Sequence, residues 1–271
     1  GCDGIGVDPA VPTDGYESIG SQRIQWVQGR FGPEHASLPC DLLCGLDMFE
    51  HLPEPLNSLR LIRRVLPASG GTPVYFESPD RDHVFNAGAG WSVYYEQCAH
   101  YDVMSIRGLF ERCGFKVIDA SRCELNPQCL GVDAVARPIN AVHAPAASSS
   151  LLEIPEHLAD FGRVQHQRVA TWRERLSRWF EMGREVVLWG SGGKGINFLN
   201  TVPGAEHIRR VIDINAARQG RFLPRGGQQV VAPTSLLAQP PSVILVSNAL
   251  WHSEISATVS DLGIDCELID V

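Results

Sequence analysis

The chain has 271 residues, which is enough for one or two domains with a substantial apolar core. Its formal net charge of −8 argues against non-specific nucleic-acid binding, because such binding needs a basic surface. No apolar run approaches the roughly 20 residues of a membrane-spanning helix, and the eight cysteines include no CxxC pair. We therefore expect a cytoplasmic protein with reduced thiols, no metal site, and neither nucleic acid nor a membrane as a partner.

The first half of the chain alternates short apolar segments with helix-like segments. The apolar segments are typical of parallel strands buried on both faces, and they span residues 4–8, 24–29, 41–49 and 72–79. Residues 54–71 place apolar side chains on one stripe and predict a helix, which "PASGG" ends. A second helix is predicted over residues 102–115, with four inward-facing side chains, Met104, Ile106, Leu109 and Phe110. Residues 115–125 and 128–137 then predict a closing hairpin.

The second half begins after a change in composition. Residues 138–155 are rich in Pro, Ala and Ser, which is typical of a linker. Residues 156–183 predict a long amphipathic helix, either core or a strut between domains, with an apolar stripe of Leu158, Phe161, Trp172, Leu176, Trp179 and Phe180. Strands and helices then alternate again. The sequence thus predicts an α/β protein with two doubly wound Rossmann-like domains, at 1–137 and 185–271, joined by a linker and long helix at 138–184.

The stretch "GIGVDPA" ends a predicted strand with an acid. In a doubly wound sheet, ligands bind beyond the carboxyl ends of the strands, so Asp8 is placed to accept hydrogen bonds from a ribose. The alternative is that Asp8 only caps the turn before Pro9.

The order of these segments resembles class I S-adenosylmethionine-dependent methyltransferases over about residues 1–137. "GIGVDPA" matches the second strand with its ribose-binding acid, "MFEHLPEP" matches the end of the fourth strand, and "FESPD" matches the fifth. The resemblance implies S-adenosyl-L-methionine as the cofactor. The cofactor-binding residues that it implies are Gly6 and Asp8 near the ribose, Gly29 and Phe31 near the adenine, and Leu46 and Asp47 at the methionine end.

The Gly-rich loop of that family, which would hold the methionyl group with backbone N–H groups, precedes the second strand. No equivalent occurs in this chain. We therefore expect an incomplete class I methyltransferase fold, truncated at its N-terminus, that alone binds the donor weakly or not at all.

The segment 91–115 has a high density of polar and aromatic residues where a loop would cover a site in this fold class. Tyr95, Glu96 and His100 are candidates for moving a proton, and Tyr94 and Gln97 for contacting a substrate. Aromatic packing in an ordered lid over residues 85–101 is the alternative. The segment resembles the Y-x-E-H stretch of sugar C-methyltransferases, but Gln97 stands where that family has its proposed base, and Gln accepts no proton. If 97–100 is a helical turn, Gln97 and His100 share a face; if it is extended, they do not.

The stretch "GSGGKG" at residues 190–195 follows a predicted strand and opens a helix. Its backbone N–H groups and Lys194 suit a phosphate, and Asp213 ends the next strand as in a dinucleotide site. A tight turn for helix–sheet packing is the alternative. Residues 185–271 resemble the C-terminal domain of the C-methyltransferase family, on Gly190–Gly195, "DIN" at 213–215, "QGR" at 219–221 and Asn248 through Ile255. That resemblance implies that Lys194 contacts the phosphate of a nucleotide-sugar.

These features predict a methyltransferase that uses S-adenosyl-L-methionine and acts on a small-molecule sugar or nucleotide-sugar, by C- or O-methylation. Two alternatives stay open. The C-terminal Gly-rich turn would serve an NAD(P)-dependent oxidoreductase, and the departure at Gln97 would suit a non-catalytic binding or scaffold remnant. The sequence leaves monomer and homodimer undecided.

Overall fold

The computed structural model describes residues 3–93, 95–139 and 154–271. The chain divides into two compact units. The first consists of Gly1–Glu77, Met104–Ala120 and Gly131–Ala147, and the second of Ser78–Val103, Ser121–Leu130 and Ser148–Val271. Residues 78–103, which lie early in the sequence, therefore group with the C-terminal half.

The first unit contains two separate sheets, one of three strands and one of four. One has the order β1-β3-β2, with β1 Gly4–Asp8, β3 Gln22–Gln28 and β2 Gly15–Ile19. The other has the order β4-β5-β7-β6, with β4 Leu43–Leu46, β5 Pro73–Pro79, β7 Cys129–Ala136 and β6 Phe115–Arg122. Strand β1 is parallel to β3, and β4 to β5, whereas β2 is antiparallel to β3. The four predicted strands and the β6–β7 hairpin are confirmed; β2 and its two-residue turn at Gly20-Ser21 were not predicted.

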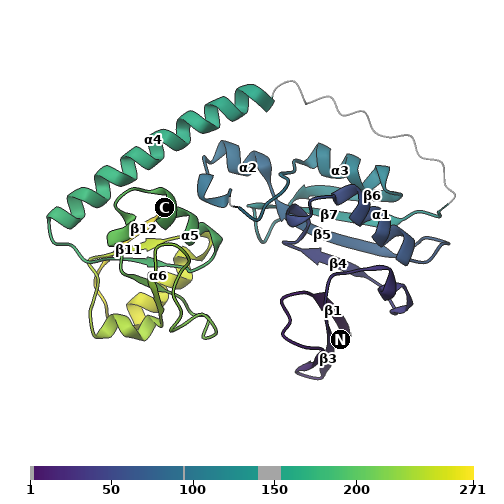
Figure 1. Ribbon diagram of the computed structural model, residues 1–271, viewed down its shortest axis with the longest axis horizontal. Coiled ribbons are helices and arrows are strands. Elements are labelled where there is room, and N and C mark those ends of the chain that lie inside the picture. Colours follow the sequence, from purple (N-terminus) through teal and green to yellow (C-terminus); the bar gives the residue numbers. More distant parts are fainter. Residues whose placement is uncertain (1–2, 94, 140–153) are drawn as a thin grey trace. The chain divides into compact units, whose positions relative to one another are not determined.

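Two helices cover the four-stranded sheet in Figure 1, α1 (Pro55–Val65) and α3 (Val103–Arg112). Two short 3-10 helices, η1 (Pro33–Ser37) and η2 (Phe49–His51), precede them. Phe110 of α3 packs against Phe76 of β5, with 5.2 Å between ring centroids. The prediction that Met104 points inward is wrong, since its side chain is 52% exposed. Met104 lies two and six residues before the buried Ile106 and Phe110, and such spacings place it on the other side of a helix.

The second unit contains a five-stranded parallel sheet of order β10-β9-β8-β11-β12, the doubly wound arrangement that the sequence predicted. Its strands are β8 Val186–Trp189, β9 Arg210–Ile212, β10 Gln229–Val231, β11 Val243–Val246 and β12 Glu267–Asp270. Its α-helices are α2 Arg81–Asn86, α4 Ile154–Glu181, α5 Gly193–Thr201 and α6 His252–Asp261. Its 3-10 helices are η3 Gly90–Ser92, η4 Ala205–His207, η5 Pro233–Leu237 and η6 Ala249–Trp251.

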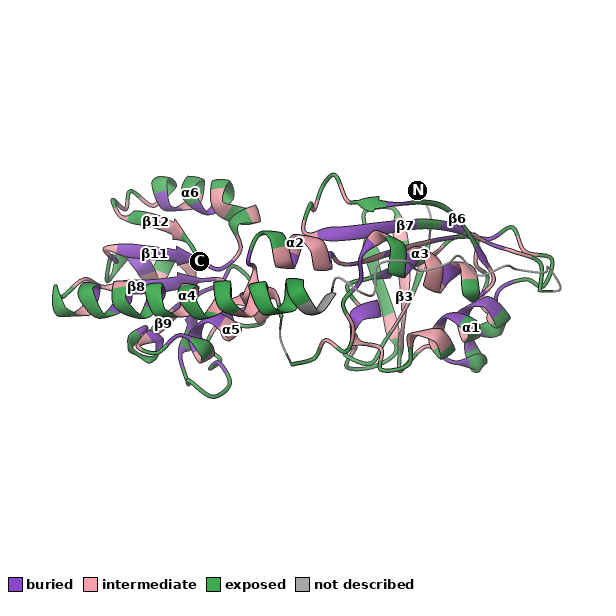
Figure 2. Ribbon diagram, turned by 90° about the horizontal axis from the view of Figure 1, so that it is seen from above, coloured by how far each residue is buried: buried purple, intermediate pink, exposed green. Residues whose placement is uncertain are grey.

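Alternate residues of the central strands enter two separate cores, as expected for a sheet covered on both faces. Leu188 and Leu245 pack with Trp172, Leu176 and Trp179 of α4 in one core. The other core joins the intervening strand residues to α6. Strands β8 and β11 are accordingly buried along their length in Figure 2. The helix predicted at 156–183 is confirmed as α4 and serves as core, although Leu158 at its start is 49% exposed. No helix among the described residues is both long and apolar enough to cross a membrane.

Candidate functional site

Asp8 lies where the parallel strands β1 and β3 end. It is in register with Gln28, and its carbonyl oxygen accepts the N–H of Gly29 at 3.3 Å. Its Oδ1 accepts the N–H of Ala10 at 2.7 Å, so one carboxylate oxygen caps the turn. Among the described residues, none donates to the other oxygen, Oδ2, and the side chain is exposed. The turn role is therefore real, and it leaves an oxygen free for a ligand.

Two neighbouring predicted residues have local structural roles. A Cβ at Gly6 would overlap the ring of Trp26, so close approach of that ring accounts for the glycine. Phe31 stacks on His35, with ring centroids 5.3 Å apart and planes 16° apart. Gly29 has a φ of 146°, which favours glycine, in the turn between β3 and Phe31.

The end of β4 is followed by the only non-glycine residue with a positive φ among the described residues of the first unit. Asp47 has a φ of 48°, a left-handed conformation that is uncommon for a residue with a side chain. Leu46, which precedes it, is 57% exposed and in register with Glu77 of β5. Strained residues concentrate at ligand sites, so the conformation of Asp47 agrees with a site at this strand end. His51 Nε2 lies 3.7 Å from the buried carboxylate of Glu50.

The loop that leads to Tyr95 is held firmly within the second unit. Asn197 Nδ2 on α5 donates to the carbonyl oxygens of Gly90 (3.2 Å), Trp91 (3.2 Å) and Val93 (2.7 Å). From α4, Gln165 donates to Gly88 O at 2.5 Å. Trp91 is buried edge-to-face against Phe198. The first part of the predicted lid is therefore an ordered segment packed on α4 and α5.

The candidate proton-moving residues follow this anchored segment; Tyr94 lies outside the described residues. Tyr95 is 99% exposed, and Glu96 is also exposed. Residues 97–100 form no helical turn, so Gln97 and His100 do not share a helical face. Gln97 Oε1 is buried without a hydrogen-bond partner among the described residues. His100 is also exposed, although partial desolvation lowers the pKa of its imidazole, which favours the neutral form that can accept a proton.

A cluster of polar side chains in the same unit was largely missed by sequence reasoning. Asp80 ends β5, caps α2, and its Oδ2 accepts both Arg122 Nε (2.9 Å) and Arg122 Nη2 (2.6 Å). Desolvation, and then the charges of Arg122 and Lys194, lower the pKa of His83, while Asp80 acts in the opposite direction. Lys194 donates to the amide oxygen of Gln128. An acid at the end of a strand, followed by "RDH", was the signal available for Asp80 and His83.

Asn248 completes this cluster from η6. Its Oδ1 accepts Gln128 Nε2 at 2.9 Å and lies 3.4 Å from Lys194 Nζ. Lys194 thus contacts neutral amide oxygens, and its charge and that of Arg122 both act on His83. We call Asp80, His83, Arg122, Gln128, Lys194 and Asn248 the polar cluster. Lys194 and Arg122, the latter paired with Asp80, both act on a neutral imidazole, and such cationic side chains suit a phosphate.

Asp213, the candidate ribose acceptor of the second unit, is occupied by its own Gly-rich turn. Its Oδ2 accepts the N–H (3.0 Å) and hydroxyl of Ser191, and its Oδ1 accepts Asn215 N at 2.8 Å. Desolvation opposes ionisation, but these hydrogen bonds and Arg218 outweigh it and lower the pKa of Asp213. A Cβ at Gly195 would overlap Gly190 O. The turn therefore follows the packing interpretation, and the carboxylate that a dinucleotide would need is engaged.

Two protein families match successive parts of the chain. A methyltransferase domain family matches residues 1–120. That part of the chain is therefore similar to methyltransferase domains, which in general depend on S-adenosylmethionine, and its sheets are consistent with an α/β, Rossmann-like fold. A C-methyltransferase C-terminal domain family matches residues 134–262, so this part of the chain is similar to the C-terminal domain of C-methyltransferases.

Similarity to individual proteins is much weaker. Comparison with curated proteins finds no significant sequence match. Among solved structures, a similar chain comes from the complex between the Haloferax volcanii Trm112 methyltransferase activator and a methyltransferase. The TM-score is 0.34 and the identity 13%, and the similarity covers 47% of this chain and 66% of that one, which is less than two thirds of its length. Similarity at this level carries no argument about function.

Proposed function

We propose that the protein transfers a methyl group from S-adenosyl-L-methionine to a sugar, and that the sugar is linked to a nucleotide. The observation that carries this proposal is the polar cluster, in which Lys194 and Arg122 lie near His83. It belongs to the same compact unit as the loop bearing Glu96 and His100. Phosphate-binding cations and a proton acceptor within one unit are what a nucleotide-sugar substrate requires.

The donor is assigned to residues of the first unit. The exposed carboxylate of Asp8 would accept the ribose hydroxyls, Gly29 and Phe31 would border the adenine, and Leu46 and Asp47 would line the methionine end. The features that support this are the Asp8 Oδ2 without a described partner and the left-handed backbone of Asp47.

The chemistry asks the protein for alignment and one proton transfer. A base removes the proton next to a keto group, and the carbon then attacks the methyl carbon of the donor. The carbon–carbon bond forms as the carbon–sulfur bond breaks, and S-adenosylhomocysteine leaves. We assign the base to His100, because desolvation lowers its pKa, with Glu96 and Tyr95 as the other candidates. A sugar hydroxyl is an alternative nucleophile.

Calorimetry with S-adenosylhomocysteine, on the full-length protein, tests the donor assignment. Asp8→Ala should weaken binding about 10- to 100-fold, since a hydrogen bond to a charged group contributes about 1.5–3 kcal/mol. Asp133→Ala, which removes an exposed carboxylate from β7, is the control and should bind as the parent does. Absence of binding by the parent would contradict the proposal and leave the scaffold interpretation.

Steady-state kinetics with nucleotide-linked keto-sugars test the acceptor assignment. Lys194→Gln should raise KM for the sugar about tenfold or more while donor affinity is unchanged. Lys116→Gln, at the only other lysine, is the matched control. His100→Ala should lower kcat, and a Gln97→His change that raises kcat would place the base at position 97 instead. We also propose that the protein is cytoplasmic and is either a monomer or a homodimer.

A further inference from the structure

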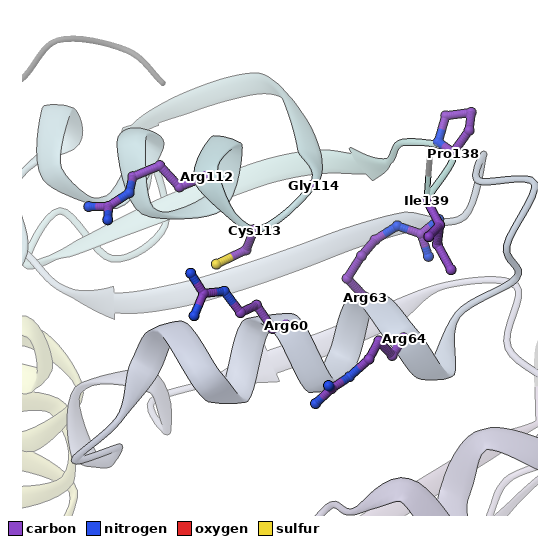
Figure 3. A pocket seen from close by; sticks show the side chains of 8 residues that line it. All are labelled: Arg60, Arg63, Arg64, Arg112, Cys113, Gly114, Pro138 and Ile139. Atoms are coloured by element: carbon purple, nitrogen blue, oxygen red, sulfur yellow. The ribbon is translucent and has the colours of Figure 1, made fainter. Parts of the chain in front are cut away.

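A cavity of about 310 Å³ lies in the first unit, away from every residue assigned above. Four arginines line it, Arg60, Arg63 and Arg64 from α1 and Arg112 from the last turn of α3, together with Cys113 and Ile139 (Figure 3). In the figure, Arg60 and the Cys113 thiol point toward one another, and Arg63 points toward Ile139.

The cavity lies at the opposite end of the strands from Leu46 and Asp47, the candidate donor-binding residues of this sheet. Arg63 Nε donates to Arg137 O at 2.7 Å, next to the end of β7, and Gly114 immediately precedes β6. Ala136 N donates to Thr72 O at 2.9 Å, so the end of β7 meets the start of β5. Leu46 and Asp47 instead follow the carboxyl end of β4, which is parallel to β5. The cavity is therefore a separate site.

The charge of this cavity is not balanced by nearby acidic residues. The chain carries a net charge of −8, yet residues 55–74 contain three arginines and no Asp or Glu. Arg63 is used by the fold, because its guanidinium also donates to the carbonyl oxygens of Leu66, Pro67 and Ala68. The acid of α3, Glu111, lies 3.8 Å from Arg107. Among the described residues, none forms an ion pair with Arg60, Arg64 or Arg112.

Helix dipoles explain only part of this pattern. Cations stabilise the last turn of a helix, which accounts for Arg63 and Arg64 in α1 and for Arg112 in α3. Arg60 lies in the middle of α1, where that effect has faded. Arg60 and Arg112 both act on Cys113, lowering the pKa of its thiol against the larger, raising effect of desolvation. The two guanidinium groups thus converge on one place from different helices.

We propose that this cavity binds a small molecule that carries a phosphate group. Guanidinium groups match the geometry of phosphate oxygens and donate paired hydrogen bonds to them. A volume of about 310 Å³ lies at the lower end of small-molecule pockets, and so fits a compact phosphate ester better than an extended acidic segment of a protein. The site goes beyond the proposed methyl transfer and does not depend on it.

Calorimetry with pyrophosphate and with a nucleoside 5′-monophosphate tests the proposal on the whole protein. Arg60→Gln and Arg112→Gln should each weaken binding about tenfold or more. Arg107→Gln, which removes the same charge from α3 outside the cavity, should leave it unchanged. Thermal melts establish that each variant is folded, and binding of S-adenosylhomocysteine should be the same in all of them, which separates this site from the donor site.

Three results would overturn the proposal. They are no saturable binding of either probe at millimolar concentration, equal weakening in Arg107→Gln, and tighter binding of an oligoglutamate peptide that displaces pyrophosphate. The last result would identify the cavity as a contact for an acidic protein.

Discussion

The side chain of Asn197 should determine both the stability of the second unit and the order of its substrate loop. Its amide donates to three carbonyl oxygens at 2.7–3.2 Å, and its Oδ1 accepts the hydroxyl of Thr201. Asn197→Leu keeps a similar shape but removes the amide NH2 group that contacts all three carbonyl oxygens. Each net hydrogen bond contributes about 0.5–1.5 kcal/mol, and one of the three acceptors is exposed, so we expect a loss of about 2 kcal/mol.

For a unit of this size, such a loss lowers Tm by about 4–8 °C. Urea denaturation followed by tryptophan fluorescence measures this loss of stability, because five of the six tryptophans, Trp91 among them, belong to the second unit. Hydrogen exchange at residues 90–93 should accelerate in parallel. Asn200→Leu is the matched control, since it lies one turn further along α5, is similarly half-buried, and its side chain bonds to no described residue. Equal destabilisation by the two variants, with unchanged exchange at 90–93, would refute the reasoning.

Three further outcomes follow from the second unit. The folded-state pKa of Asp213 is depressed, so the ionised carboxylate stabilises the fold above the unfolded pKa of about 4, and this stabilisation is lost as pH falls through the folded-state pKa. Urea unfolding should therefore show that the loss of stability caused by Asp213→Asn becomes smaller between pH 7 and 3. Arg122→Gln removes a cation that opposes protonation of His83, so an NMR titration should find the pKa of His83 raised; an unchanged or lower value would contradict the arrangement. Gly195→Ala should lower the stability of the second unit by about 1–3 kcal/mol, because the new Cβ overlaps a backbone carbonyl. Gly162→Ala, in an open stretch of α4, should instead raise the stability by about 0.5–1 kcal/mol. Thermal melts that reverse this order would contradict the packing argument.

Periodicity was sufficient to predict the elements whose burial is regular. The strands of the second unit send alternate residues into two cores, and α1 and α4 carry continuous apolar stripes. Strand β2 was not predicted, because most of its side chains are exposed, although Gly20-Ser21 is a hairpin signal. Met104 was misplaced because an apolar residue in a first helical turn was assumed to face inward.

Sequence reasoning likewise proposed some residues of the candidate site and missed others. Asp8 could be proposed from topology, because the carboxyl end of a strand is fixed by its position in the sheet, whereas Asp47 was proposed from the family resemblance. The polar cluster could not be assembled, because Asp80, Gln128 and Lys194 are far apart in the sequence and meet only through tertiary packing. Asp213 shows the converse, since a strand-end acid that looks available in the sequence is consumed by its own turn.

The grouping of residues 78–103 with the C-terminal half bears on how substrate specificity would change. Family comparison places these residues in the methyltransferase domain, yet Asn197 of α5 and Gln165 of α4 hold them in the second unit. The segment that leads to Glu96 and His100 is therefore held by α4 and α5, which lie in the part of the chain that is similar to C-methyltransferase C-terminal domains. Substitutions in α5 should then alter acceptor kinetics while leaving donor affinity intact, because the residues assigned to the donor belong to the first unit.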